Sequence, residues 1–484
     1  MASARLQTPI AREFAATLRL AVPLAAANLL QMAVYAIDVI FVARLGQQAL
    51  AASSLAVSLF VLVVWGFTGL TGAVAPLIAA DLGRRRNPVR EARRSVRMAL
   101  WLVLLTGALG FVLCTYGEAF LLLTGQDEML ARRAGDYLEI IRWATIPMLT
   151  SNVLRIFVSA LDRAVFATMI TAGAILVNGA ANYALVFGNW GAPALGLEGA
   201  ALASVITAVL TTCAYIAAIQ TDRRTKRYRL FGRFWRTEWS RMREIVRIGL
   251  PIGLTVIAEA GLFSAAAFLM GRIGAAELAA HTLALQVVSI FFQVPFGIAQ
   301  AATIRVGFHF GAQDREGIRM AGWAALVIGG GFMLVSALTM LTIPRLILSL
   351  YVDVTAPANA ALVAFAVSYL GVAAMFQLFD GTQTVAAGVL RGLQDTRVPM
   401  WIALGGYWAI GFVVAASLGL GSPLRGIGVW LGLAAGLVTV AALLLRRWSE
   451  RERLGLVPIH RNGLERSGLR PAARKAERPP AGAP

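Results

Sequence analysis

The chain has 484 residues, of which 58% are hydrophobic and only 14% are charged. Soluble domains carry about 25% charged residues. This composition, with a mean hydropathy of +0.71, therefore excludes a soluble enzyme and a disulfide-stabilised scaffold. The net charge of +19 would suit a nucleic-acid binder, but the basic residues lie between apolar segments and in the C-terminal tail. We therefore expect an integral membrane protein that binds no nucleic acid.

The apolar segments divide the chain into predicted spans. A membrane-spanning helix needs about 20 apolar residues, and a helix with its connection takes about 40, so the chain length predicts twelve helices. The first apolar segment is long enough to span and lacks a signal-peptide cleavage pattern, so it is expected to stay in the protein. In chain order, the predicted spans are 17–43, 48–76, 95–117, 137–158, 164–188, 196–220, 246–271, 277–304, 318–343, 358–389, 398–420 and 426–445.

The distribution of basic residues predicts the orientation in the membrane. Of the 44 Lys and Arg residues, 37 fall on one predicted side, among them Arg155 and Arg391, and seven on the other. Because Lys and Arg are enriched in cytoplasmic connections, we expect both termini in the cytoplasm and the protein in the bacterial cytoplasmic (inner) membrane. The resulting parts are an N-terminus (1–16), an N-lobe of six helices (17–221), a linker (222–245), a C-lobe of six helices (246–446) and a tail (447–484).

Two of these parts lie outside the predicted spans. Segment 228–247, which covers most of the linker, interleaves basic residues with aromatic ones, which predicts an amphipathic helix on the cytoplasmic membrane surface. The tail is basic and rich in Pro and Gly, and it has too few apolar residues to fold alone, so it is predicted to be disordered. Deletion of the chain after Trp448 should then be tolerated.

The two predicted lobes are related by an offset of 228 residues. ARLGQQALAAS (43–53) matches GRIGAAELAAH (271–281). Further identical pairs are Pro23/Pro251, Gly69/Gly297 and Gly83/Gly311. Because each lobe has an even number of helices, the repeats are predicted to be parallel, with a binding site near the midplane. The sequence thus predicts an all-α membrane protein of two six-helix bundles, an architecture typical of transporters that work by alternating access.

Three carboxylates lie well inside the predicted spans: Asp38, Glu259 and Asp380. An ionisable group costs about 2.5–3.5 kcal/mol to insert at the centre of a helix. No Lys or Arg within a span stands close in sequence to any of the three, which favours ion or substrate coupling over structural salt bridges. Pairing in the tertiary structure is the alternative that the sequence leaves open.

Other polar residues share helical faces with these acids or form faces of their own. Side chains three or four residues apart lie on one face of a helix. The sets are Asn28, Gln31, Tyr35 and Asp38; Asn178 and Asn182, followed by Tyr183; Thr282, Gln286, Ser289 and Gln293; and Gln377, Asp380 and Thr384. They are candidates for a cation or substrate site, and the alternative for each amide and hydroxyl is hydrogen bonding between helices.

Carboxylates inside an apolar bundle suit the exchange of cations. A carboxylic acid in such surroundings can hold a proton near neutral pH, and carboxylate oxygens can bind a hard cation such as Na⁺. Na⁺ at Asp38, Glu259 and Asp380 and H⁺ are therefore both open as the coupling ion. The sequence predicts no other cofactor and no structural metal site, because its His and Cys residues have no ligand spacing.

In three segments the chain resembles the multidrug and toxic compound extrusion (MATE) family. The matching segments are YAIDVIFVARLG (35–46), AAHTLALQVVSIFFQVPFGIAQAATIRVGFHFGAQD (279–314) and FDGTQTVAAGVLRGLQDTRVP (379–399). The combination of Glu259 and Asp380 is similar to the NorM-type branch. The resemblance implies a V-shaped pair of bundles, cation-coupled efflux and cationic aromatic substrates. It also implies that Asp38, Asn178, Asn182, Glu259 and Asp380 match cation- or drug-binding positions.

We therefore predict an antiporter, coupled to Na⁺ or H⁺, that exports small cationic amphipathic compounds. We expect it to work as a monomer among membrane lipids. The main alternative is a lipid-linked saccharide flippase of the same superfamily, which would be expected to have fourteen helices and a basic cavity. A membrane-embedded enzyme would need a nucleophile with its base or a metal motif such as HExxH, and none occurs in the sequence. A receptor or channel is disfavoured by the lobe repeat.

Overall fold

The computed structural model describes residues 9–84, 87–232 and 234–458. Regular structure in these ranges is helical, and no strand occurs in them. The first half contains α1 (Pro9–Ala43), α2 (Gln47–Gly72), α3 (Val74–Gly83), α4 (Pro88–Thr115), α5 (Gly117–Leu123), α6 (Glu128–Ile141), α7 (Thr145–Ala160), α8 (Ala164–Phe187), α9 (Gly196–Thr221) and α10 (Arg223–Lys226). The second half contains α11 (Trp239–Ile273), α12 (Ala275–Gly311), α13 (Arg315–Thr342), α14 (Pro344–Leu348), α15 (Ala360–Gly392), α16 (Arg397–Leu404), the π-helix η5 (Gly405–Phe412), α17 (Val413–Gly421) and α18 (Arg425–Ser449).

Eleven segments of the described ranges are long and apolar enough to cross a membrane. Three of them are composite: α2 continues into α3, the 3-10 turn Pro357–Asn359 leads into α15, and α16, η5 and α17 form one segment. The remaining predicted span, 137–158, falls on α6 and α7, which the 3-10 turn Arg142–Ala144 separates. Neither piece alone has the length of a span, although the two together do. The predicted all-α architecture is thus confirmed, and eleven spans together with the α6–α7 pair are approximately consistent with the predicted count of twelve.

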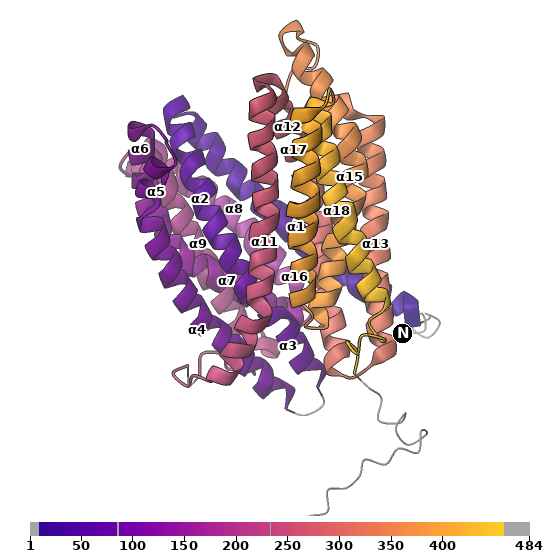
Figure 1. Ribbon diagram of the computed structural model, residues 1–484. Helices are drawn as coiled ribbons and strands as arrows, with labels where there is room; N and C mark the ends of the chain where they lie inside the picture. The colour runs from indigo at the N-terminus through magenta and orange to yellow at the C-terminus, as the bar shows by residue number, and fades with distance from the viewer. Residues whose placement is uncertain (1–8, 85–86, 233, 459–484) are drawn as a thin grey trace, which may run out of the picture.

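The spans form two bundles, the N-lobe (α1–α9) and the C-lobe (α11–α18), which diverge toward the top of Figure 1. Each lobe has its own apolar core. The first helix of each lobe crosses to the other lobe. Leu20 and Leu24 of α1 belong to the C-lobe core, whereas Ile245 and Ile252 of α11 belong to the N-lobe core. The crossing ties the lobes together at the lower end in Figure 1.

Glycines at this end let the two lobes approach closely. A Cβ atom at Gly83 would lie 2.0 Å from the backbone oxygen of Phe308, and one at Gly311 would lie 1.9 Å from that of Ala80. Phe308 and Gly311 follow Ala80 and Gly83 by 228 residues, so the contact is reciprocal about a pseudo-twofold axis. The same relation pairs Gly69 with Gly253 and Gly297 with Ala25. We call Gly69, Gly83, Gly297 and Gly311 the inter-lobe seam.

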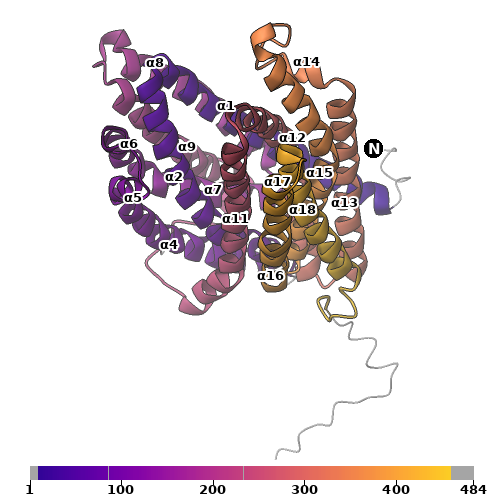
Figure 2. The same ribbon diagram turned by 45° about the horizontal axis from the view of Figure 1, so that its top comes forward.

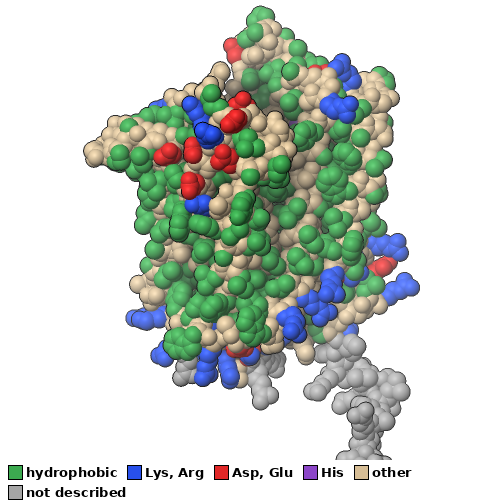
Figure 3. Space-filling view, turned by 60° about the vertical axis from the view of Figure 1, so that its left-hand side comes forward, with side chains coloured by type: hydrophobic (Ala, Val, Ile, Leu, Met, Phe, Trp, Pro, Cys, Tyr) green, Lys and Arg blue, Asp and Glu red, His purple; other side chains and the backbone are tan. Residues whose placement is uncertain are grey.

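Charged side chains gather at the two ends of the bundle. Figure 3 shows a broad apolar surface between a lower edge lined by Lys and Arg and an upper end where acidic and basic residues mix. The lower edge carries the beginning of α1, the end of α3, the beginning of α4 and the end of α18 (Figure 1), and we call it the basic end. The apolar surface fits the lipid-facing side of a multi-pass membrane protein.

The amphipathic helix predicted for 228–247 is wrong over its first half. Residues 227–232 and 234–238 form turns and irregular structure, and α11 begins at Trp239. Tyr228 and Leu230 are buried in the N-lobe core. Trp101 of α4 stacks on Phe234 and donates its indole N–H to the Phe234 carbonyl at 2.9 Å. These aromatic residues therefore cover the N-lobe, because its exposed apolar ends provide a closer partner than the membrane surface.

The predicted boundaries at the two chain ends also need correction. α1 begins at Pro9, inside the segment predicted as the cytoplasmic N-terminus (1–16), and residues 1–8 lie outside the described part. The tail predicted as disordered from 447 packs on the C-lobe as far as 458. Val457 is buried, Arg315 donates to the Pro458 carbonyl at 2.8 Å, and Arg451 covers Trp448. Apolar contacts of this short segment outweigh its basic composition; residues 459–484 lie outside the described part.

Candidate functional site

The N-lobe holds Asp38 in a cage of hydrogen-bond donors from two other helices. The side-chain amides of Asn178 and Asn182, one turn apart on α8, donate to Asp38 Oδ1 at 2.9 and 2.8 Å. Ser204 of α9 donates its hydroxyl to Asp38 Oδ2 at 2.9 Å. The carboxylate accepts all three bonds, an arrangement that suits its ionised form. Three residues singled out from the sequence thus meet at one point.

The same cage contains two oxygen atoms without a partner. Asn178 Oδ1 and Asn182 Oδ1 are buried and accept no hydrogen bond within the described residues. Carboxylate and amide oxygens are the ligands that hard cations prefer. Because each amide turns its N–H₂ group toward Asp38, its oxygen faces away from the carboxylate, and the amides would have to flip to hold a small cation together with Asp38.

The C-lobe brings its two carboxylates together through a shared amide. Gln383 of α15 donates its Nε2 to Glu259 Oε1 of α11 at 3.1 Å and to Asp380 Oδ1 at 3.3 Å. Tyr407, in the π-helix η5, donates its hydroxyl to Gln383 Oε1 at 2.6 Å. The chain Tyr407–Gln383–carboxylates orients the two acids toward one point. A single cation placed there would interact with both carboxylates.

Neither acidic cluster is closed by a salt bridge. Within the described part of the chain, no Lys or Arg nitrogen lies within 4.0 Å of Asp38, Glu259 or Asp380. Arg391, which the charge pattern assigns to the cytoplasmic side, interacts electrostatically with Glu259 without forming such an ion pair. The acids are therefore not held as partners in structural ion pairs.

Other candidates take different positions. Tyr35 lies one turn from Asp38 on α1 and interacts with it electrostatically. Gln31 and Gln286 make no side-chain hydrogen bond to any described residue, and Gln286 is exposed on α12. Gln377 accepts from the Ser336 hydroxyl at 2.6 Å and donates to the Val288 carbonyl at 3.1 Å, so it joins three helices. For Gln377 the alternative of hydrogen bonding between helices is the one that the geometry supports.

Sequence reasoning missed three members of these clusters. Gln383 follows Asp380 by three residues, and this spacing alone could have placed it on the same helical face. Ser204 and Tyr407 carry no such signal, because each reaches its cluster from a different helix. Tyr407 depends in addition on the π-helix Gly405–Phe412, a local widening of the backbone that is frequent at functional sites.

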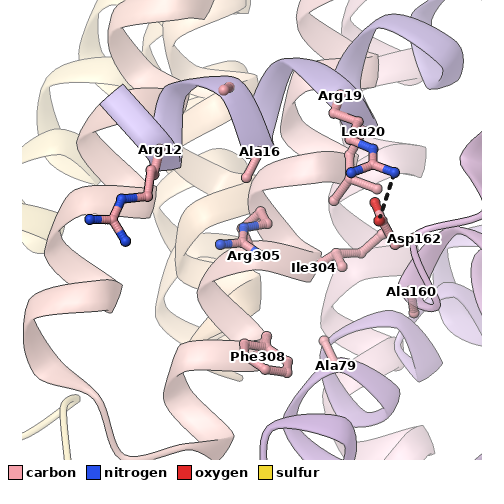
Figure 4. Close-up of a pocket in the computed structure, with 11 residues that line it drawn as sticks. Arg12, Ala16, Arg19, Leu20, Ala79, Ala160, Asp162, Ile304, Arg305 and Phe308 are labelled. Atoms are coloured by element: carbon pink, nitrogen blue, oxygen red, sulfur yellow. Dashed lines mark ion pairs between the residues drawn. The ribbon is translucent and has the colours of Figure 1, made fainter. Parts of the chain in front are cut away.

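A separate cavity of about 440 Å³ lies at the basic end, between α1, α12 and the turn that joins α7 to α8 (Figure 4). Its charged lining residues are Arg12, Arg19, Arg305 and Asp162. Arg19 pairs with Asp162 at 3.5 Å. Arg305 is paired with Glu13 of α1. Because the guanidinium groups still outnumber these carboxylates, a cation is disfavoured here, and the acidic clusters form the candidate cation site.

Two parallel six-helix repeats with carboxylates inside each lobe define the architecture of a secondary transporter. The chain belongs to the MatE family, whose model matches residues 23–184 and 251–416. The two matches begin at Pro23 and Pro251, the offset that the internal repeat predicts. The protein is therefore a membrane transporter and not an enzyme.

Relatives and solved structures agree with this assignment. The chain is 45% identical over 443 residues to "Probable multidrug resistance protein NorM" of Mesorhizobium japonicum, covering 92% of this chain and 95% of the relative. It is 38% identical to "Multidrug resistance protein NorM" of Burkholderia vietnamiensis, covering 91% and 94%. The crystal structure of the eukaryotic MATE transporter AtDTX14 superposes with a TM-score of 0.81 at 22% identity, covering 92% and 99%. The resemblance to the NorM-type branch is thus confirmed.

Proposed function

We propose that this protein is an antiporter that exports small amphipathic, mainly cationic compounds in exchange for Na⁺ or H⁺. The observation that carries the proposal is the pair of carboxylate clusters inside the lobes, neither of which has a Lys or Arg within 4.0 Å. Uncompensated acids inside a membrane are costly, and a travelling cation gives them a function. The multidrug names of the relatives support export of several substrates.

The proposed mechanism is alternating access. The lobes are tied together at the basic end and diverge at the opposite end (Figure 1), which corresponds to a state open to the outside if the basic end faces the cytoplasm. The predominance of Lys and Arg at that end supports this orientation. Binding of the coupling ion would release the substrate, and the lobes would then reopen toward the cytoplasm.

The flippase alternative is less well supported. Lipid-linked saccharides carry phosphate groups, and a carboxylate such as Asp38 or Glu259 repels them. The named relatives are also multidrug resistance proteins.

The test is export of a fluorescent organic cation by inverted membrane vesicles, driven separately by a Na⁺ gradient and by a pH gradient. We expect one gradient to drive uptake into these vesicles, and Glu259→Gln and Asp380→Asn each to abolish it at normal expression. Glu198→Gln is the matched control, because Glu198 is exposed at the beginning of α9. Uptake by both cluster variants at the level of the control would refute the role of the acids. Failure of both gradients with the unmodified protein would refute coupled export.

A further inference from the structure

The N-lobe contains an arginine that the proposed cation exchange does not use. Arg155 lies on α7, five residues before its end. Its Nη1 donates to Asn28 Oδ1 of α1 at 3.2 Å, and its Nη2 donates to Asn152 Oδ1 at 3.1 Å. Both partners are neutral amides. No carboxylate oxygen within the described ranges lies within 4.0 Å of this guanidinium, so its charge is not compensated locally.

Two further donors beside Arg155 also lack a partner. Asn28 Nδ2 and Asn152 Nδ2 are buried and donate to no acceptor among the described residues. Asn28 is only 5% exposed. Because each amide uses its oxygen to hold the guanidinium, its N–H₂ group is left facing away from any protein acceptor. A guanidinium flanked by two unused amide donors is a donor set for an anion, the reverse of the oxygen-rich cage around Asp38.

The position of this group favours access from inside the lobe. α7 packs against α2, α3, α4, α8 and α9, and both ribbon views place it among the N-lobe helices (Figures 1 and 2). The Arg155 side chain points toward α1, which places α1 on the remaining side. The side chain nevertheless keeps some accessible surface. Because the guanidinium reaches Asn28 of α1, we infer that this surface faces the space between α7 and α1.

The C-lobe builds a corresponding cluster with the opposite charge. In each lobe, a residue on the fourth span bonds the residue three positions before it and also reaches the first span. In the C-lobe, Gln383 bonds Asp380 and Glu259; in the N-lobe, Arg155 bonds Asn152 and Asn28. Arg155 and Asn152 correspond to Gln383 and Asp380 at the offset of 228, so the two clusters occupy equivalent positions of the fourth span. The same frame therefore carries two acids in one lobe and one guanidinium in the other.

We propose that Arg155, Asn28 and Asn152 form a subsite for the carboxylate of zwitterionic amphipathic substrates. This inference rests on the proposed export function and specifies its substrate class. Asn28 and Asp38 are ten residues apart on α1, which is about 15 Å along the helix axis. An elongated molecule can therefore place its carboxylate at Arg155 and its amine near Asp38. The guanidinium binds a carboxylate with two parallel hydrogen bonds.

The test compares two dyes in the same vesicles. Rhodamine B carries a carboxylate beside its cationic ring system, and its ethyl ester is a cation only. Arg155→Gln should raise the KM for rhodamine B by about 10- to 100-fold, the range expected from the loss of a charge-assisted hydrogen bond. Transport of the ester should stay within about twofold, because the ester makes no such bond. Arg155→Lys, which keeps the charge without the planar fork, should lie between the two.

Arg163→Gln is the matched control. Arg163 also lies in the N-lobe toward the basic end, but it is paired with Asp222 at 3.0 Å, so its loss should not distinguish the dyes. Equal loss of both dyes in Arg155→Gln would indicate a structural role and overturn the subsite, as would an unchanged KM for rhodamine B. Export of the ester without export of rhodamine B by the unmodified protein would overturn the subsite and leave the proposed function standing. Export of neither dye would refute both.

A binding measurement covers the case in which Arg155→Gln does not fold. Purified unmodified protein should bind rhodamine B about tenfold more tightly than the ester by fluorescence polarisation. The difference should persist from neutral to alkaline pH, because a guanidinium keeps its charge there. Equal affinity for the two dyes would contradict a carboxylate subsite.

Discussion

Replacing Gly311 with alanine should destabilise the state in which the basic end is closed. The new Cβ would lie 1.9 Å from the Ala80 carbonyl oxygen, whereas such contacts are essentially never shorter than 3.0 Å. The two backbones must therefore separate by about 1 Å at this point of the inter-lobe seam. Backbone on both sides makes the contact rigid, so no side chain can rotate to relieve it.

The magnitude follows from the cost of overpacking. An inserted methyl group in a close-packed contact costs about 1–3 kcal/mol, which is about a 5- to 150-fold shift in a two-state equilibrium. The shift should favour the state in which the lobes separate at the basic end. Gly83→Ala should act similarly, because its Cβ would meet the Phe308 carbonyl oxygen at 2.0 Å across the same pseudo-twofold axis.

The assay is a distance measurement between spin labels at exposed positions on the two lobes. Arg90→Cys on α4 and Arg319→Cys on α13 provide the sites, in a background without Cys114 and Cys213. Gly311→Ala should move the distance distribution toward longer values and lower the rate of transport. Gly330→Ala is the control, because a Cβ there meets no atom within 4 Å. Unchanged distances and transport in Gly311→Ala would refute the argument that the seam closes the basic end.

Three other predictions concern the clusters and the C-terminal segment. Asp38→Asn should reduce vesicle transport more than tenfold, because it removes the charge. Ser204→Ala removes one hydrogen bond worth about 1 kcal/mol and should reduce transport about fivefold. Equal effects of the two variants would contradict a role of the charge. Tyr407→Phe should raise the coupling-ion concentration for half-maximal transport by about fivefold, because Gln383 loses the bond that orients it, and an unchanged value would show that Gln383 needs no support. Deletion after Trp448 should lower the melting temperature, because burial of Val457 alone contributes about 1.5–3 kcal/mol. Deletion after Pro458 removes none of these contacts and is the control. Equal melting temperatures of the two truncated proteins would show that the segment adds no stability.

The sequence predicted the architecture and the acidic residues for a common physical reason. Apolar length identifies spans, and an acid such as Asp38 or Glu259 inside a span is too costly to be incidental. The amides Asn178 and Asn182 were identifiable because one turn separates them on an apolar helix. That they face Asp38 is a tertiary fact, since no local pattern specifies which helix lies opposite.

The errors arose where one composition fits two environments. The aromatic and basic residues around Tyr228 fit both a membrane surface and the end of a helical bundle. In the structure they pack on the apolar core of the N-lobe. The segment ending at Pro458 has few apolar residues, yet Val457 is enough to pack it on the C-lobe. Arg155 was counted with the cytoplasmic arginines because charge patterns report position along the chain and not the direction of a side chain.

The internal repeat therefore specifies the frame more strictly than the charges within it. Glu259 corresponds at the offset of 228 to Gln31, and Asp38 corresponds to Ala266, which is buried in the C-lobe core. At close backbone contacts such as those of Gly83 and Gly311, both repeat-related residues are glycine, because the two lobes share that interface. Each lobe interior is free to change alone, since its helices enclose it separately. The two lobes can therefore share one backbone arrangement and still carry their acidic clusters at different depths. They can also differ in that only the N-lobe holds a guanidinium.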